Sequence, residues 1–246
     1  MEAPTVRLLP YEIADGAANM AADEVLLEAA SQGKASLRCY GWSVPTLSLG
    51  YFQAAAARSS DPCFVELPWV RRATGGEALV HHFEITYALA LPSGLPWQKH
   101  GDSWICRMHG IIRAALSSLG VPLQSCGETE EKRLGDFLCY LHHTPGDVLL
   151  DGHKVVGSAQ RKRHGALLQH GGILLATSPF TPALPGINDL CGAQLTNTLV
   201  REAVTAEFVR QTGWVLRESD WTTAERRRCQ ELTAGRYANP LWNAKR

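Results

Sequence analysis

The sequence predicts an α+β fold, in which a mixed, largely antiparallel sheet is flanked by helices in a single domain over residues 1–246. Three observations support this. Strand-like runs dominate the middle of the chain, and helical patterns occupy its ends and one place between. The two types do not alternate regularly, as the βαβ units of a parallel sheet would require. With 45% hydrophobic residues, the chain can also bury a substantial core.

The first predicted helix covers residues 19–30, where Met20, Val25, Leu26 and Leu27 stand among good helix formers and Gly33 follows as a stop. Short apolar or β-branched runs then predict strands at residues 37–40, 46–49, 64–70, 78–80 and 85–91. An amphipathic pattern predicts a helix over residues 104–119 that ends at Gly120, with a strand entry at 121–123.

Strands are expected at residues 147–150 and 155–157, on either side of Asp151-Gly152. This dipeptide is favoured in tight hairpin turns, because both central positions need a positive φ. Another strand is predicted at residues 167–175, and helices at 200–211 and 223–233. The chain from about residue 180 onward is therefore expected to be a helical portion of the same domain.

Composition excludes several classes of function. The 24 basic residues balance the 24 acidic ones, whereas a general nucleic-acid binder usually has a basic excess. No apolar run approaches the roughly 20 residues that cross a membrane, and the N-terminus lacks the basic and apolar regions of a secretion signal. Seven cysteines without paired spacing fit a reducing compartment. We therefore expect a cytoplasmic protein with no nucleic-acid or membrane partner.

A basic, glycine-containing motif follows one predicted strand: Arg71, Arg72, Thr74, Gly75 and Gly76 lie within six positions. Adjacent glycines allow a close backbone approach or a positive φ, and consecutive free N–H groups can bind an anion or a carbonyl oxygen. The motif alone is also compatible with an ordinary basic turn.

The histidines do not indicate a metal. His81 and His82 are adjacent, so on a strand they face opposite sides and cannot easily bind one ion. Cys139 lies near His142 and His143, but structural zinc sites usually have two close ligand pairs, and the chain has no CxxC. We predict no metal site.

Cys139 and Lys154 are the candidate pair for catalysis. A cysteine with a cationic partner is suited to acyl transfer, because the thiolate attacks and a nearby cation favours it. Taken alone, Cys139 is one of seven cysteines and Lys154 could be a solvated strand lysine. Arg161–His164 could be only a charged loop, or it could dock an acidic partner.

Four segments together resemble the lipoate/octanoate protein ligase and transferase family, within the biotin/lipoate A/B protein ligase superfamily. They are Asn19-Met20-x-x-Asp23-Glu24, then RRATGGEALVHHFEITY (71–87), then Cys139 followed by KVVGSAQRKRHGALLQHGGILL (154–175), and YANPLWNAKR (237–246). The two central motifs are specific, and their order and separation agree too. The sequence is most similar to the cysteine-dependent octanoyltransferase branch.

The resemblance implies the catalytic-domain fold shared with biotin ligases, and a reaction without a cofactor. Octanoyl would pass from acyl carrier protein to Cys139, and then to a lysine of a lipoyl domain in glycine cleavage H protein or a 2-oxoacid dehydrogenase E2. Lys154 would hold the acyl carbonyl and stabilise the oxyanion. The implied pocket consists of Arg72, Thr74, Gly75, Gly76 and His81 on one side, and Gly157, Ser158, Gln160, His170 and Gly171 on the other.

Three departures from the family pattern stand out: Glu77 replaces a glycine or arginine, His82 replaces an acidic residue, and the residues around Pro145 differ. A carboxylate at Glu77 would repel an adenylate phosphate and so disfavours ATP-dependent ligation. Cys191, in the run GINDLCG, resembles the nucleophile segment of an analogous octanoyltransferase class and is the alternative nucleophile.

Other functions stay open at this level. An ATP-dependent lipoate ligase would use ATP and Mg²⁺, with Lys154 contacting the adenylate, and would not need Cys139. An amidotransferase between lipoyl domains would share the thiol and differ in the donor. An inactive acyl-binding protein would not need the Cys139–Lys154 pair, and a biotin ligase would carry a basic glycine-rich loop of another form.

Overall fold

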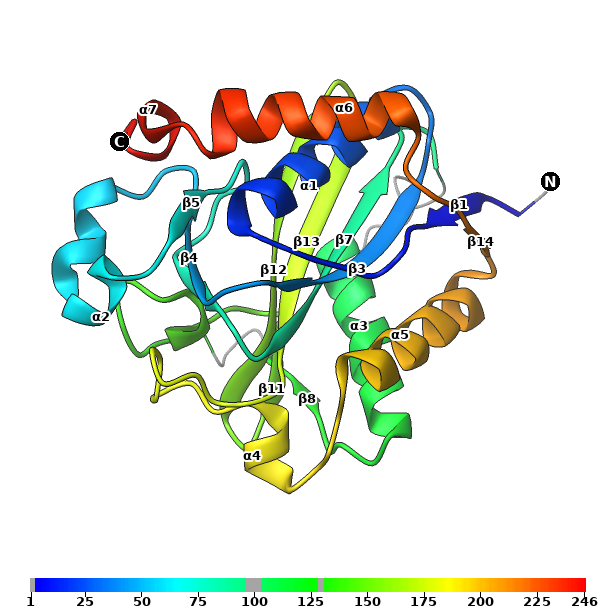
Figure 1. Cartoon of the computed structure of the whole chain (residues 1–246). Helices are drawn as coiled ribbons and strands as arrows, with labels where there is room; N and C mark the ends of the chain where they lie inside the picture. Colours follow the sequence, from blue (N-terminus) through cyan, green and yellow to red (C-terminus); the bar gives the residue numbers. More distant parts are fainter. Residues whose placement is uncertain (1–2, 96–102, 128–130) are drawn as a thin grey trace.

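The computed structural model describes residues 3–95, 103–127 and 131–246, and a large mixed sheet forms its centre (Figure 1). In the described residues this sheet consists of nine strands: β1 (Thr5–Leu8), β2 (Glu12–Ala14), β3 (Ser36–Trp42), β7 (Glu84–Leu91), β8 (Gln124–Ser125), β11 (Val148–Leu150), β12 (His153–Arg163), β13 (Ala166–Leu174) and β14 (Val215–Glu218). Their spatial order is β14-β1-β3-β7-β13-β12-β11-β8, with β2 beside β3.

Smaller elements surround this sheet. A second sheet has the order β5-β4-β6, and a third pairs β9 with β10. These strands are β4 (Thr46–Leu49), β5 (Trp69–Arg71), β6 (Leu79–His81), β9 (Lys132–Arg133) and β10 (His142–His143). The α-helices are α1 (Gly16–Ser31), α2 (Pro62–Val65), α3 (Trp104–Ser118), α4 (Ile187–Cys191), α5 (Asn197–Thr212), α6 (Thr223–Leu232) and α7 (Pro240–Asn243). Short 3₁₀ turns cover Ala55–Ser60 and Cys139–Leu141, and a π-turn covers Thr233–Tyr237.

Antiparallel pairs build the middle of the large sheet. β3, β7, β13, β12 and β11 pair antiparallel in that order, whereas β1 pairs parallel with both β3 and β14. The turn between β11 and β12 has φ 48° at Asp151 and 75° at Gly152, as the Asp-Gly dipeptide predicts. The sheet is therefore mixed and largely antiparallel, which confirms the predicted fold class.

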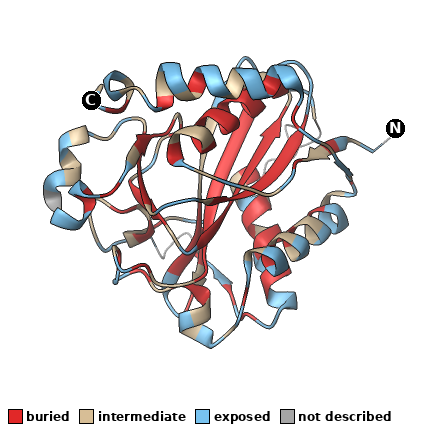
Figure 2. Ribbon diagram, viewed as in Figure 1, coloured by how far each residue is buried: buried red, intermediate tan, exposed pale blue. Residues whose placement is uncertain are grey.

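Helices cover both faces of the large sheet. α1 and α6 lie over one face, and α3 and α5 over the other (Figures 1 and 2). Strand alternation sorts the side chains of β7: Tyr87 and Leu89 pack in the cluster with α3 and α5, while Ala88 and Ala90 pack against α1. The small alanines allow α1 to lie close to the sheet. Because both faces are covered, every residue of β7 is buried.

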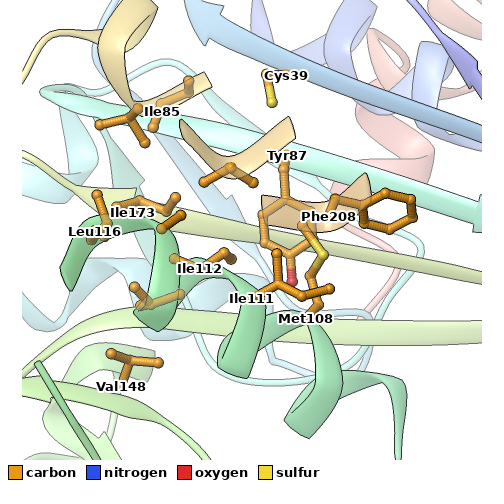
Figure 3. Close-up of a cluster of buried hydrophobic side chains, with 14 of the residues drawn as sticks. Cys39, Ile85, Tyr87, Met108, Ile111, Ile112, Leu116, Val148, Ile173 and Phe208 are labelled. Atoms are coloured by element: carbon orange, nitrogen blue, oxygen red, sulfur yellow. The ribbon is translucent and has the colours of Figure 1, made fainter. Parts of the chain in front are cut away.

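The core between the sheet, α3 and α5 explains why α3 forms where the sequence predicts it. Ser103 caps its N-terminus by accepting from the Cys106 amide. Met108, Ile111 and Ile112 lie on its inner face and pack with Tyr87 (Figure 3). Burying one such aliphatic side chain contributes about 1.5–3 kcal/mol, so the packed face contributes more than intrinsic helix propensity.

Several predicted elements need correction. Residues 64–70 are not one strand: Asp61 caps the short helix α2, Pro62 occupies its first turn, and β5 begins only at Trp69. Residues 121–123 precede β8 rather than starting it. β12 is longer than the predicted 155–157 because its start pairs with β11 and residues 156–163 pair with β13. The strands β1, β2 and β14 were missed, and β14 interrupts the C-terminal helices.

The helices of the described ranges lack the length and apolar composition that would let one of them cross a membrane.

Candidate active site

A pocket lies between the large sheet and the smaller β5-β4-β6 sheet. One side comes from β4, β6 and the glycine loop, defined here as residues 72–78. The other side comes from β12, β13 and the turn at Cys139. The lining residues are Met20, Tyr40, Ser48, Arg72, Gly76, Glu77, Leu79, His81, Thr86, Cys139, Tyr140, Gly157, Ser158, Ala159, His170, Gly171 and Gly172. Two motifs far apart in the sequence therefore meet in one cavity.

Cys139 and Lys154 lie together at this pocket. The Cys139 amide donates to the carbonyl of Ala78 at 2.8 Å, which attaches the cysteine turn to the end of the glycine loop. Lys154 extends from β12, and its Nζ lies 3.9 Å from the Cys139 Sγ. The same ammonium donates to the carbonyls of Cys139 at 3.3 Å and His142 at 3.0 Å. Only 3% of the lysine side chain is exposed, so water screens its charge weakly.

Asp147 is a charged neighbour of this pair that the sequence analysis missed. Its carboxylate lies 2.7 Å from the Lys154 Nζ, and 5% of its side chain is exposed. It also accepts from the amide and the hydroxyl of Thr144, at 2.8 and 2.9 Å. The sequence held a usable signal, because residues 147 and 154 are diagonal neighbours across a hairpin with a two-residue turn. Asp147 holds the ammonium of Lys154 beside Cys139.

Arg72 shapes the glycine loop from inside. Its guanidinium donates to the carbonyls of Gly75 at 2.9 Å and Glu77 at 2.7 Å. Gly76 has φ 87°, a conformation that favours glycine. A Cβ placed on Gly50 would lie 1.8 Å from the Gly76 carbonyl oxygen, so the loop packs directly on a glycine of the preceding segment. The positive φ that was expected at the adjacent glycines therefore occurs at Gly76, and Gly50, which the sequence did not single out, allows the close approach.

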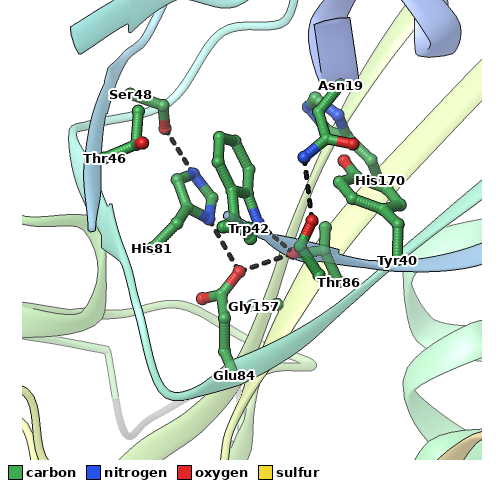
Figure 4. A network of polar contacts seen from close by, with 12 residues as sticks. Asn19, Tyr40, Trp42, Thr46, Ser48, His81, Glu84, Thr86, Gly157 and His170 are labelled. Atoms are coloured by element: carbon green, nitrogen blue, oxygen red, sulfur yellow. Dashed lines mark hydrogen bonds and ion pairs between the residues drawn. The ribbon is translucent and has the colours of Figure 1, made fainter. Parts of the chain in front are cut away.

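A first hydrogen-bonded chain leads from Arg72 to His81. The Arg72 guanidinium donates to the Ser48 hydroxyl at 3.1 Å, and this hydroxyl lies 2.8 Å from the His81 Nε2. The His81 Nδ1 lies 2.7 Å from Glu84, and the imidazole stacks on Trp42 with ring centroids 3.7 Å apart (Figure 4). Burial lowers the pKa of His81, so the imidazole is neutral near pH 7.

A second chain of the same kind leads from Arg72 to His170. The Arg72 Nε donates to the Thr74 hydroxyl at 3.2 Å, which lies 2.7 Å from the His170 Nε2. The His170 Nδ1 lies 2.7 Å from the Asp23 carboxylate, which also accepts from Tyr40 at 2.9 Å. The buried guanidinium thus faces two carboxylates, each through a hydroxyl and an imidazole. Thr74 supports the pocket from behind without lining it.

The floor of the pocket contains Ser158, whose hydroxyl lies 2.6 Å from both the Tyr87 hydroxyl and the His109 Nε2. Burial lowers the pKa of His109, and its Nδ1 lies 2.7 Å from a backbone carbonyl. A Cβ on Gly171 would lie 2.4 Å from the Gly157 carbonyl oxygen, so this glycine lets β12 and β13 approach. Ser158 was predicted from the sequence, whereas His109, which contacts it from α3, was not.

Some predicted residues lie elsewhere. Gln160 does not line the pocket; its amide donates to Gln169 at 2.7 Å. Cys191, the alternative nucleophile, is exposed in α4 and is not among the lining residues. Glu77 does line the pocket, and its carboxylate pairs with Arg133 at 2.9 Å. His82 lies 3.1 Å from the Ser178 hydroxyl, outside the pocket.

No group of three or more histidine, cysteine or acidic side chains is placed to hold a metal ion within the described ranges.

The profile of the lipoyl protein ligase A/B catalytic domain matches residues 15–184. An octanoyltransferase LipM of Kyrpidia tusciae is 31% identical over 271 residues, covering 97% of this chain and 98% of that protein. A LipM of Moorella thermoacetica is 30% identical over 275 residues and covers 100% of both chains. A bi-partite lipoate protein ligase of Thermoplasma acidophilum has the same fold, with a TM-score of 0.71, 21% identity and coverage of 98% and 96%.

Proposed function

Since the chain belongs to the lipoyl protein ligase A/B catalytic-domain family, we propose that it transfers octanoyl from acyl carrier protein to a lipoyl-domain lysine. Curated octanoyltransferase relatives over the full chain length support the reaction class. A lipoyl-domain acceptor is supported by the similar ligase, which was studied with its E2 lipoyl domain. The reaction would occur in the cytoplasm.

One observation carries the proposal: the Cys139 thiol and the Lys154 ammonium lie 3.9 Å apart at a pocket between the two central motifs. In the first step, the Cys139 sulfur attacks the carbonyl carbon of the carrier thioester. The new S–C bond replaces the carrier's S–C bond, and the carrier thiol leaves with the proton of Cys139. Lys154 is placed to stabilise the negative charge that develops on the carbonyl oxygen.

In the second step, the amine of the acceptor lysine attacks the Cys139 thioester. An amide bond forms, Cys139 leaves as the thiol, and the amine loses one proton. Met20 and Leu79 give the pocket an apolar lining that fits the octanoyl chain. Both steps exchange one acyl bond for another, so we propose that the reaction requires neither ATP nor a metal ion.

The alternative is an ATP-dependent lipoate ligase, because the shared fold also occurs in a lipoate-protein ligase A that was solved with bound ATP. The Glu77 carboxylate lines the pocket but pairs with Arg133 at 2.9 Å, and this ion pair offsets the repulsion of an adenylate phosphate that the sequence alone suggests. The ATP requirement therefore has to be tested directly. An amidotransferase would use the same thiol with an acylated lipoyl domain as donor.

The test is the intact mass of the enzyme after mixing with octanoyl-carrier protein without ATP. We expect an octanoyl-sized, hydroxylamine-labile adduct that is absent in Cys139→Ser and present in the matched variant Cys191→Ser. Loss only in Cys191→Ser would keep the reaction class and move the nucleophile. Lipoyl-domain modification that appears only with ATP and free acid would indicate a ligase, and acylation only by an octanoylated lipoyl domain would indicate an amidotransferase.

A further inference from the structure

The C-terminal segment folds back onto the end of β5 and onto the 3₁₀ turn that begins at Ala55. The Arg71 amide donates to the Asn243 side chain at 2.8 Å, and the Trp242 indole donates to the Arg71 carbonyl at 2.9 Å. The Ala55 amide donates to the Arg246 carbonyl at 2.7 Å. Part of this network is fully buried, so the last residues hold a defined position rather than trailing from the surface.

Three cations converge on the half-buried ring of Tyr51 in this region. The Lys245 Nζ lies 3.6 Å from the ring centroid, and the guanidinium carbons of Arg246 and Arg161 lie 5.1 and 5.5 Å from it. In the part of the chain that the structure describes, no ion pair joins any of the three to a carboxylate. We call these three cations with Tyr51 the cation cluster.

A fourth positive charge lies beneath the cation cluster. Arg71 is fully buried, and its Nη2 has no hydrogen-bond partner among the described residues. Burial lowers the pKa of Arg71, and repulsion from Arg246 lowers it further. The repulsion among these positive charges is unfavourable, and a bound anion would offset it.

The cation cluster sits at one end of the glycine loop and Cys139 at the other. The Tyr51 amide donates to the Thr74 carbonyl at 2.8 Å, and the Arg161 guanidinium donates to the Ala73 carbonyl at 2.7 Å. The opposite end of the loop, at Ala78, is bonded to the Cys139 amide. From residue 73 to residue 78 an extended chain spans at most about 18 Å. The backbone that links the cation cluster to the residue bonded to Cys139 therefore spans no more than about 18 Å.

We propose that the cation cluster binds the phosphodiester of the phosphopantetheine arm that delivers the acyl thioester to Cys139. The proposal rests on the proposed function, in which the donor is a carrier thioester. That arm is a flexible chain with the thioester at one end and a phosphate at the other, and the phosphate is its charged group. Arginine forks and a lysine ammonium are the groups that proteins use for phosphate. Lys245, with Arg246 beside it, lowers the pKa of the Tyr51 hydroxyl, because these positive charges favour its ionised form.

The test compares two small donors that lack the carrier protein: octanoyl-pantetheine and octanoyl-phosphopantetheine. The readout is kcat/KM for acylation of Cys139. For the wild-type enzyme we expect the phosphorylated donor to be about 10- to 100-fold better, as charge-assisted hydrogen bonds of this kind provide. In Lys245→Gln/Arg246→Gln this ratio should fall towards one. The matched control, Arg113→Gln/Arg217→Gln, removes two exposed arginines from α3 and β14 and should keep the wild-type ratio.

Several results would overturn the inference. The inference fails if the wild-type enzyme uses both donors with similar kcat/KM. It also fails if Lys245→Gln/Arg246→Gln keeps the wild-type preference, because the cation cluster then does not bind the phosphate. If this variant slows only the complete carrier protein, the cations contact the carrier's acidic surface instead. If it impairs only an ATP-dependent reaction with free octanoate, the phosphate belongs to a nucleotide.

A failure of the proposed reaction can be distinguished from a failure of the proposed phosphate site. If no donor acylates Cys139, calorimetry on the same enzyme compares binding of phosphopantetheine and pantetheine without any chemistry. Tighter binding of the phosphorylated compound, lost in Lys245→Gln/Arg246→Gln, supports the site independently of the reaction. Equal binding of the two compounds rejects it.

Discussion

The buried pair between Lys154 and Asp147 offers a quantitative test of the site. Their charges lie 2.7 Å apart with 3% and 5% of the side chains exposed. At an effective dielectric constant of 20, the attraction is about 6 kcal/mol before the cost of burying both groups is subtracted. Removing one partner of such a pair typically costs about 3–5 kcal/mol, because the other charge stays buried without compensation. We therefore expect Lys154→Met and Asp147→Asn each to lower the free energy of unfolding by this amount.

The double variant Lys154→Met/Asp147→Asn removes both charges and should be more stable than the sum of the single effects by about 2–3 kcal/mol. Urea unfolding of the four proteins measures this coupling. Additive single effects, within about 0.5 kcal/mol, would refute a direct ion pair between Lys154 and Asp147 in solution.

The same variants separate structure from catalysis. Lys154→Met removes the ammonium beside Cys139, so thioester formation should slow by about 10²–10³-fold, as for loss of one oxyanion donor. Asp147→Asn keeps the ammonium and should slow the reaction less, although both variants lose similar stability. An equal loss of rate would mean that the ammonium acts only where Asp147 holds it.

Three further predictions follow from local geometry and electrostatics. In Gly50→Ala, the new Cβ would lie 1.8 Å from the Gly76 carbonyl oxygen, so the glycine loop must move and thioester formation should be lost; a normal acylation rate would contradict this. Burial raises the pKa of Cys39 to about 12, so iodoacetamide at pH 8 should leave it unmodified in the native protein while exposed cysteines react, as peptide masses would show. Burial opposes ionisation of Glu225, but hydrogen bonds that include Arg7 outweigh this effect and lower the pKa of Glu225 to about 2. The ionised glutamate therefore stabilises the fold fully above the pKa of an unfolded glutamate, about 4.3, and this stabilisation disappears as the pH falls towards 2. Arg7→Met should therefore cost about 1–2 kcal/mol at pH 7 and little at pH 2, because the pair is partly open to solvent, and an equal cost at both pH values would argue against the pair.

Local sequence signals predicted much of the fold correctly. The helix at α3 followed from apolar spacing with a stop at Gly120, and the hairpin between β11 and β12 followed from Asp151-Gly152. These features depend on residues a few positions apart, which a single sequence displays directly. The error at residues 64–70 has the same origin, because an apolar run can be a helix or a strand, and the cap at Asp61 decided it.

The sequence by itself determined which residue types are available to the site, because the two central motifs and Cys139 supply a thiol, a cation and a glycine loop. Only the tertiary structure decided which groups surround them. Asp147, His109 and Asp23 reach the site from a strand start and two helices, and Cys191 stays outside it. The physical reason is that a buried charge needs a compensating partner, and packing decides which group lies close enough to serve as one. Those depend on contacts between distant segments, such as the 147 positions between Asp23 and His170.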